Sequence, residues 1–264
     1  MVDTARSVGR FDRVGQVDAP VDVKQTGPHA APRTAVVWAV LRKELARVGR
    51  PLTAVDVGGG TGGFAVPLAK AGHQVTVVDA SPDALAALTR RAAEAGVGER
   101  VTAVQGDADA LADLVAPGSV DLVLCHSLLE VVDDPNRVVE SLAGVLRPGG
   151  AASVVVASRA AAVLARALSG QIAAASLLVA SPDGRGDLRD RLKRRFDLDG
   201  ATELLESGGL TVEQAHGVRI VADLVPGAVA EQEHEALQAF ELAVAARPPY
   251  RDIATQLHLL GRKR

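Results

Sequence analysis

Short apolar runs alternate with helical patterns through the middle of the chain. Five runs, TAVDV, QVTVVD, VTAVQG, VDLVLC and AASVVVA, have the nearly continuous apolar character of buried strands. Valine and leucine at helical spacing over 34–48 predict an amphipathic helix before the first run. Because successive βα units place parallel strands between two layers of helices, the pattern predicts a doubly wound α/β fold.

The other segments differ from this core. Residues 1–50 comprise a polar arm with scattered Gly and Pro and then the covering helix, and residues 51–158 hold the five runs. The helical pattern over residues 159–208 predicts a helical insertion or lid. Residues 209–264 contain LTVEQAHGVRIV and ATQLHLLGRK as late strands, with a helix over 231–246 between them. We expect a mostly parallel seven-stranded sheet whose last strand is antiparallel.

Certain residues predict where elements begin and end. Ser81 is a suitable N-cap residue, and Pro82 occupies the first helical position after it. The sequence RPGG over 147–150 predicts a tight turn into the fifth run. A helix over 199–207 is expected to end at the glycine pair that follows it.

Composition narrows the functional classes. The 264 residues carry 29 Lys and Arg against 32 Asp and Glu, a net charge of −3 that excludes a histone-like binder. Aromatic residues make up 2% of the chain, so stacking platforms for single-stranded nucleic acid are scarce. The apolar runs fall short of the ~18 residues of a membrane span, and the N-terminus has no apolar signal region. With a single cysteine, we expect a cytoplasmic protein without a membrane or metal partner.

A glycine-rich turn, VGGGTGG over 57–63, follows the first run and opens a helix. Glycine allows a tight turn and the close approach of a ligand to the backbone. The string fits both the G-x-G-x-x-G pattern of dinucleotide sites and a G-x-G-x-G pattern, so it does not identify the ligand by itself.

Three neighbouring features favour one cofactor. Asp56 lies at the end of the first run, where a carboxylate would face an ammonium group and would repel a pyrophosphate. Asp79 ends the second run, where it could accept hydrogen bonds from ribose hydroxyls. GDAD over 106–109 follows the third run, where small and acidic residues could border an adenine. Taken separately, Asp56 and Asp79 could equally be helix-terminal charges or caps.

The set resembles class I S-adenosylmethionine-dependent methyltransferases. In that family the first-strand acid lies near the methionine end of the cofactor, the glycines line it, and the second-strand acid binds the ribose. The resemblance therefore implies S-adenosyl-L-methionine as the cofactor.

A longer set of segments is similar, in sequence and order, to one bacterial family, the tRNA 5-carboxymethoxyuridine methyltransferases. It comprises residues 33–38, GGGTGGFAVPLAKAGHQVTVVDAS, LCHSLLEVVDDP, LRPGG, HGVRIVADL and PPYRDIATQLHLLGRK. Those enzymes esterify the carboxylate of a modified wobble uridine. The similarity runs from about Gly27 to Lys263, and its last two segments lie outside the generic cofactor core. The resemblance implies tRNA as the methyl acceptor.

The two resemblances and the loop pattern together give a set of expected cofactor-binding residues. They are Arg33, Asp56, Gly58, Gly59, Gly60, Asp79, Ala80, Ala108, Asp109 and His126. A guanidinium such as that of Arg33 could hold the methionine carboxylate through two hydrogen bonds. His126 ends the fourth run, where it could contact the cofactor or act as a base, although a lone histidine is often structural.

Methyl transfer to a carboxylate needs no strong base, because an ionised carboxylate is already a nucleophile. We therefore assign no catalytic residue. Arg219 could orient such an acceptor and Tyr250 could close its pocket, although both could equally be surface residues. The fourth run lacks the Asn/Asp-Pro-Pro-aromatic signature of DNA amino-methyltransferases. Cys125 lies within a strand and is expected to be a buried thiol.

Other hypotheses remain open. The arm and the segment 157–159 depart from the family. The basic residues over 185–195 could bind phosphates, but Asp187 and Asp190 offset their charge, and such runs are usually a solvated helix face. A small-molecule O- or N-methyltransferase is the runner-up. A non-catalytic protein that binds S-adenosylmethionine is a third hypothesis, and a nicotinamide oxidoreductase is weakened by Asp56. The sequence gives no oligomeric state.

Overall fold

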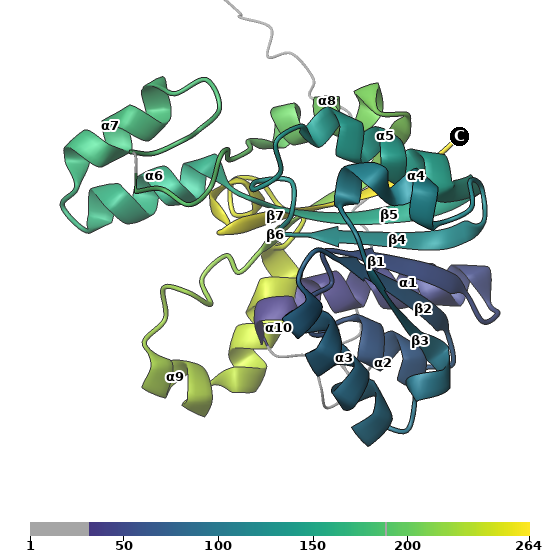
Figure 1. Cartoon of the computed structure of the whole chain (residues 1–264). Helices are drawn as coiled ribbons and strands as arrows, with labels where there is room; N and C mark the ends of the chain where they lie inside the picture. The colour runs from purple at the N-terminus through teal and green to yellow at the C-terminus, as the bar shows by residue number, and fades with distance from the viewer. Residues whose placement is uncertain (1–31, 188) are drawn as a thin grey trace, which may run out of the picture.

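The computed structural model describes residues 32–187 and 189–264, so the N-terminal arm expected as a lid lies outside the described residues. Its centre is a seven-stranded sheet with the strand order β3-β2-β1-β4-β5-β7-β6 (Figure 1). The strands are β1 (Thr53–Val57), β2 (Gln74–Asp79), β3 (Val101–Gln105), β4 (Val120–His126), β5 (Leu146–Ala157), β6 (Leu210–Val218) and β7 (Gln256–Lys263). Strand β7 runs antiparallel to both neighbours, while β1 to β5 pair in parallel. The predicted fold class is confirmed.

Helices cover both faces of the sheet (Figure 1). The helices are α1 (Ala35–Val48), α2 (Ala65–Lys70), α3 (Pro82–Glu94), α4 (Leu111–Leu114), α5 (Pro135–Val145), α6 (Arg159–Leu168), α7 (Ile172–Ala180), α8 (Leu198–Ser207), α9 (Gly227–Gln232) and α10 (His234–Val244). Helices α1, α2 and α3 pack on one face, and α4, α5 and α8 pack on the other. This is the layer order that consecutive right-handed βα units produce.

The core is divided by the sheet itself. Along β4, Leu122 and Leu124 contact the cluster under α1, α2 and α3, while Val123 and Cys125 contact the cluster under α5 and α8. Alternate side chains of a strand point to opposite faces, so a strand covered on both sides must be apolar throughout. Burial raises the pKa of the Cys125 thiol, and its expected place in the core is confirmed.

Side-chain caps start several helices, and the cap predicted at Ser81 is confirmed. The Ser81 side chain accepts a hydrogen bond from the backbone N–H of Ala84, and Pro82 is the first residue of α3. Asp134 accepts from the N–H groups of Asn136 and Arg137 at the start of α5. Such caps satisfy the backbone donors that the first turn of a helix leaves free.

Three element boundaries differ from the sequence predictions. The RPGG turn is instead part of β5, where the register against β4 shifts and Gly149 has a φ of 75°. The single helix expected over 231–246 is two helices that meet at Glu233. The strand expected over 210–221 ends at Val218, because Arg219 adopts a left-handed φ of 60°.

A buried carboxylate fixes this last turn. Glu241 of α10 is fully buried, and its oxygens accept hydrogen bonds from the backbone N–H groups of Ile220, Val221 and Ala222 at 2.8–2.9 Å. These backbone donors would otherwise pair with a neighbouring strand. The side chain of α10 therefore turns the chain away from the sheet immediately after Arg219.

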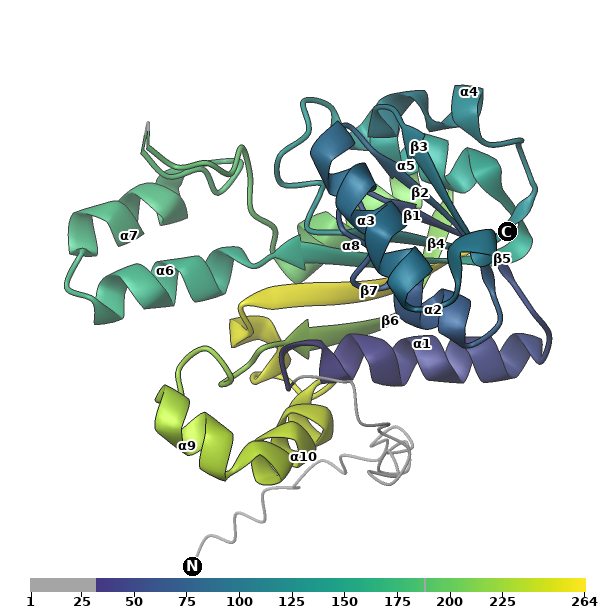
Figure 2. The same ribbon diagram turned by 60° about the horizontal axis from the view of Figure 1, so that its bottom comes forward.

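Segment 159–208 divides into two parts. Helices α6 and α7 form a hairpin that projects from the body of the molecule, as Figure 2 shows. Helix α8 instead packs on the sheet, where Ala201, Leu204 and Leu205 join the core cluster. The projecting hairpin stands beyond the carboxyl ends of the parallel strands, beside the candidate site.

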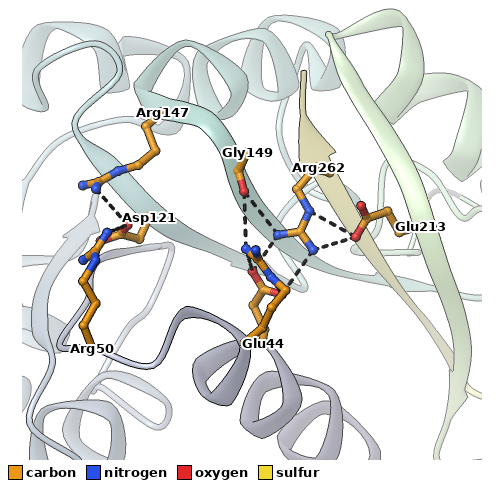
Figure 3. A network of polar contacts seen from close by, with 8 residues as sticks. Glu44, Arg50, Asp121, Arg147, Gly149, Glu213 and Arg262 are labelled. Atoms are coloured by element: carbon orange, nitrogen blue, oxygen red, sulfur yellow. Dashed lines mark hydrogen bonds and ion pairs between the residues drawn. The ribbon is translucent and has the colours of Figure 1, made fainter.

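The opposite, amino-terminal edge of the sheet is closed by ion pairs (Figure 3). Asp121 of β4 pairs with Arg50 at 2.6 Å and with Arg147 at 3.0 Å. Glu44 of α1 pairs with Arg262 of β7 at 2.6 Å, and Arg262 also reaches Glu213. Burial raises the pKa of Glu44, but hydrogen bonds from Arg47 and Arg262 prevail and lower it to about 2.

Within residues 32–187 and 189–264, no helix has the length and apolar character needed to cross a membrane. Over the same residues, no group of three His, Cys, Asp or Glu side chains is arranged to hold a metal ion.

Candidate functional site

The structure brings most of the expected cofactor residues to one edge of the sheet. Strands β3, β2, β1 and β4 are adjacent and parallel, so their carboxyl ends meet there. The strand order reverses between β1 and β4, and open α/β sheets bind ligands outside the strand ends at such a point. The glycine turn follows β1, Asp79 ends β2 and Ala80 follows it, a short helix at Ala108–Ala110 follows β3, and His126 ends β4.

Asp56 is buried beneath the glycine turn. Its side chain makes no hydrogen bond or ion pair with the described residues, and it is 3% exposed. Burial, with a smaller contribution from the charge of Asp79, raises its pKa to about 7. A Cβ atom on Gly59 would lie 2.5 Å from Cγ of Asp56 and 2.9 Å from Cγ1 of Val77. The backbone at Gly59 is therefore pressed against the carboxyl group.

Asp79 ties the turn to the next helix. Its Oδ2 accepts a hydrogen bond from the N–H of Gly60 at 2.8 Å, and its Oδ1 accepts from the N–H of Ser81 at 2.9 Å. Gly58 and Gly60 have φ values of 69° and 54°, which favour glycine. Each carboxylate oxygen still has a further lone pair for a ligand.

Beyond β3, Ala108 packs against the core, while Asp109 is exposed. The hydroxyl of Ser141 on α5 donates a hydrogen bond to the Asp109 carbonyl at 3.2 Å. The Ala80 carbonyl on the neighbouring strand accepts a hydrogen bond from the side-chain amide of Gln105. The expected cofactor residues after β2 and after β3 therefore lie on backbone that hydrogen bonds hold in place.

His126 is the first member of a polar chain that crosses three strands. Its Nε2 lies 2.9 Å from Oγ of Ser153 on β5, which lies 2.9 Å from Nε2 of His258 on β7. The Nδ1 atom of His126 is buried and has no hydrogen-bond partner among the described residues. Burial lowers the pKa of His126 to about 3, so its imidazole is neutral at physiological pH.

Aromatic contacts join His126 to α1. The ring of Phe64, which follows the glycine turn, meets the His126 ring edge-on with centroids 4.5 Å apart, and Trp38 of α1 stacks on Phe64 at 5.1 Å. The chain before α1, which carries Arg33, is thereby placed near the turn.

The two expected arginines meet on one carboxylate. Nε of Arg33 lies 3.4 Å from Oδ1 of Asp223, and Nε of Arg219 lies 3.3 Å from Oδ2. The Arg33 side chain is 65% exposed, which leaves its guanidinium accessible to a ligand. The structure thus links the residue expected at the methionine end of the cofactor with the residue expected to hold the acceptor.

A cavity of about 450 Å³ opens beside Arg219. One wall is the apolar face of α6, including Ala161, Leu164 and Leu168. The rest comes from the end of β5, the start of β7, the chain after β6, and the segments that carry Glu130 and Arg195. Its volume lies within the range of small-molecule sites. Polar side chains among the lining residues are Glu130, Ser158, Arg195, Arg219, Asp223, Thr255 and Gln256.

Tyr250 is not part of this lining. It is 45% exposed and precedes a short helix at Arg251–Ile253, whose Ile253 does line the cavity. The structure therefore does not bring Tyr250 together with Arg219 in this cavity.

The basic segment over 185–195 makes mostly internal contacts, through Arg194 and Arg195, and we call this pair the clamp. Arg194 donates hydrogen bonds to the carbonyls of Leu129, Val132 and Asp133 at 2.7–3.0 Å. Arg195 is nearly buried and holds Asp190 through two hydrogen bonds. In contrast, the arginines at 185, 189 and 191 are exposed. The clamp holds the loop after β4, which carries Glu130, under the projecting hairpin.

Sequence reasoning missed four polar residues of this region, namely Glu130, Ser153, Asp223 and His258. Asp223 lies four residues after Arg219, which was a usable signal for an ion pair. Glu130 lies in the segment LCHSLLEVVDDP, but its burial depends on the distant clamp. Ser153 and His258 sit in apolar strands, and no local pattern indicates that they meet.

Comparison with known proteins gives the family context. Residues 55–154 match the family model described as a methyltransferase domain. The tRNA 5-carboxymethoxyuridine methyltransferase of Escherichia coli K12 is 29% identical over 236 residues, which cover 88% of each chain. A ubiquinone biosynthesis O-methyltransferase of Xanthomonas euvesicatoria is 33% identical over 171 residues, covering 62% of this chain and 64% of that one.

Solved structures share the fold. An S-adenosylmethionine dependent methyltransferase from Mesorhizobium loti aligns with a TM-score of 0.57 at 20% identity, covering 86% of this chain and 98% of that one. The 1,6-didemethyltoxoflavin-N1-methyltransferase of Burkholderia thailandensis, solved with bound 1,6-didemethyltoxoflavin and S-adenosylhomocysteine, aligns with a TM-score of 0.54 at 22% identity, covering 89% of this chain and 79% of that one.

Proposed function

We propose that this chain, an S-adenosylmethionine-dependent methyltransferase whose residues 55–154 match the methyltransferase-domain model, methylates the carboxylate of 5-carboxymethoxyuridine in tRNA. The observation that carries the proposal is the extent of the similarity. It covers 88% of both chains for the tRNA enzyme of E. coli, but only 62% of this chain for the ubiquinone enzyme of X. euvesicatoria. A tRNA substrate would place the enzyme in the cytoplasm.

The residues at the sheet edge fit the cofactor. The buried Asp56 carboxyl lacks a partner among the described residues, and the unpartnered Nδ1 of His126 leaves a second polar group for a ligand. In this proposal Asp56 faces the cationic methionine end, and Asp79 accepts hydrogen bonds from the ribose. The glycine turn, with Ala80, Ala108 and Asp109, borders the nucleoside, and Arg33 holds the methionine carboxylate. When bound, S-adenosylmethionine supplies an electrophilic methyl group.

The cavity beside Arg219 fits an anionic acceptor. Glu241 holds the backbone after Arg219, and this places the guanidinium in the cavity lining. An arginine there can orient a carboxylate, and an ionised carboxylate needs no base. The work left to the protein is to align two reactants and to exclude water. The neutral His126 and the apolar face of α6 suit that role.

The exposed arginines of the basic segment support a nucleic-acid acceptor. Arg185, Arg189 and Arg191 are free of the internal clamp and lie on the segment that follows the hairpin. Contacts to phosphates would make binding weaken as salt concentration rises.

A small-molecule acceptor is the second candidate. The ubiquinone enzyme of X. euvesicatoria is more identical over the shared region, at 33%. The apolar α6 wall of the cavity would also suit a hydrophobic ring.

The decisive experiment compares tRNA nucleosides from a deletion strain and its parent by mass spectrometry. We expect the methyl ester of 5-carboxymethoxyuridine to disappear and the free acid to accumulate in the deletion strain. Unchanged ester levels would refute the tRNA acceptor.

The purified enzyme provides the matching test. With undermethylated tRNA, Arg219→Gln is expected to raise KM for tRNA at least ~10-fold, because an arginine–carboxylate pair is lost. Arg90→Gln, an exposed change on α3, is the control. Equal KM values for the two variants would remove Arg219 from the acceptor site.

A further inference from the structure

A buried carboxyl group borders the acceptor cavity. Glu130 follows β4, is 3% exposed and is among the residues that line the 450 Å³ cavity with Arg219. Its Oε2 atom is buried and has no hydrogen-bond partner among the described residues. Buried polar atoms are nearly always paired, so an orphan next to a cavity marks a place for a ligand.

The two arginines of the clamp, Arg194 and Arg195, do not form an ion pair with the Glu130 carboxyl group. The guanidinium of Arg194 is committed to three backbone carbonyls. That of Arg195 is committed to the Asp190 carboxylate and to the carbonyl of Gly184. Across the cavity, the Nε of Arg219 already faces Asp223. Glu130 therefore stands among cations without an ion pair of its own in the described part of the chain.

This environment favours the neutral acid. Burial raises the pKa of Glu130 to about 7, against the opposing effects of the backbone N–H groups of Glu130 and Ala157 and of the two nearby arginines. A protonated carboxyl group has an O–H donor, which an ionised one lacks. The charged or titratable groups around it are Cys125 on β4, Arg166 on α6, Asp190, Arg194 and Arg195 in the clamp, and Arg219 and Asp223 after β6.

We propose that the protonated carboxyl group of Glu130 donates a hydrogen bond to the carboxylate of the acceptor and so selects for acid substrates. The proposal rests on the proposed function. Arg219 and Glu130 then supply a cation and a neutral donor to the two oxygens of one acceptor. An ionised Glu130 would repel the same group, because two like charges would share a dry cavity.

The chemistry balances without a proton transfer. One acceptor oxygen forms the new bond to the methyl carbon, the carbon–sulfur bond breaks, and its electron pair stays on sulfur. The acceptor's negative charge and the sulfonium's positive charge both disappear. Glu130 keeps its proton throughout, so it is a specificity-determining residue and not a general base.

A hydroxyl or amine acceptor would reverse the requirement. Such a group must lose a proton, and an ionised Glu130 would be suited to accept it. The same side chain thus gives opposite pH dependence for the two classes of acceptor.

The test is calorimetric binding of the nucleoside 5-carboxymethoxyuridine from pH 6 to pH 8.5, with S-adenosylhomocysteine saturating. If binding requires the neutral acid and its pKa is about 7, the affinity of the wild-type protein should fall about 30-fold over this range. Glu130→Gln keeps an N–H donor that does not titrate, so its affinity should be flat. Glu140→Gln, an exposed change on α5, should follow the wild type.

Two further readouts separate the outcomes. Subtracting the infrared spectrum of Glu130→Gln from that of the wild type at pH 6 should leave the band of one protonated carboxyl group, because the contribution of Asp56 is common to both proteins and cancels. Thermal melts should show that each variant is folded. Wild-type affinity that does not change with pH, or a Glu130→Gln variant that follows the wild-type profile, would overturn the role of Glu130 and leave the carboxylate acceptor standing. If the wild type binds S-adenosylhomocysteine but no carboxylate nucleoside at any pH, both proposals fall.

Discussion

The buried carboxyl of Asp56 has a cost in stability that can be measured. It is 3% exposed, and it has no hydrogen bond or ion pair among the described residues. We predict that Asp56→Asn, which removes the charge at nearly constant volume, stabilises the cofactor-free protein at alkaline pH. The same change should weaken binding of S-adenosylhomocysteine at least ~10-fold, since the amide cannot attract the ammonium group.

The magnitude follows from the pKa. Burial raises it from 3.8 to about 7, which corresponds to about 4 kcal/mol at 1.36 kcal/mol per pKa unit. For an acid whose folded pKa is raised, the folded state binds more protons than the unfolded state, so stability falls as pH rises from 3.8 to 7. The loss is complete above pH 7. Between pH 5 and pH 8 the wild type should therefore lose about 3 kcal/mol relative to Asp56→Asn.

Urea unfolding at pH 5 and pH 8 measures this quantity. The comparison between the two pH values cancels any pH-independent effect of the amide itself. Asp113→Asn, an exposed change on α4, is the control and should shift both values equally. If the gap between the wild type and Asp56→Asn is the same at both pH values, the carboxyl is not destabilised by burial and the reasoning fails.

Three further predictions test other parts of the structure. Gly59→Ala should weaken S-adenosylhomocysteine binding at least ~10-fold in calorimetry, because its Cβ would lie 2.5 Å from Cγ of Asp56, whereas Gly144→Ala on α5, with open space around it, should bind normally. Glu44→Gln should lower the free energy of unfolding by about 3 kcal/mol at pH 7, because Arg262 loses a buried partner, and the deficit in urea melts should shrink toward pH 2 as the wild-type carboxyl protonates. NMR should show that His126 and His258 stay neutral down to pH 5, since burial lowers both pKa values, and a histidine signal set that titrates throughout near pH 6.5 would contradict this.

The strands β1 to β5 and the glycine turn could be predicted because their signals are local. Apolar runs such as TAVDV reveal a doubly covered strand, and Ser81 with Pro82 marks a helix start on its own. The end of β6 could not be predicted in this way. The sequence HGVRIV reads as one strand, but the Glu241 carboxylate, about twenty residues away, takes the backbone donors and turns the chain.

The site was predictable in part for the same reason. Asp56 and Asp79 stand next to strand ends, so their shared edge follows from parallel pairing. The surroundings of the Glu130 and Asp223 side chains are formed by α6, the clamp and the loop after β6, which lie apart in the sequence. Which charges a buried carboxyl meets is a property of three-dimensional packing, and neither periodicity nor spacing encodes it.

The ion pairs at the amino-terminal edge have an evolutionary consequence. Asp121 and Glu44 fasten the strands at the end of the sheet remote from the α6 cavity (Figure 3). Mutations that reshape the cavity leave these ion pairs intact, so new acceptor preferences can arise without unfolding the protein. A lineage built on this plan can change its methyl acceptor by altering one rim of the molecule.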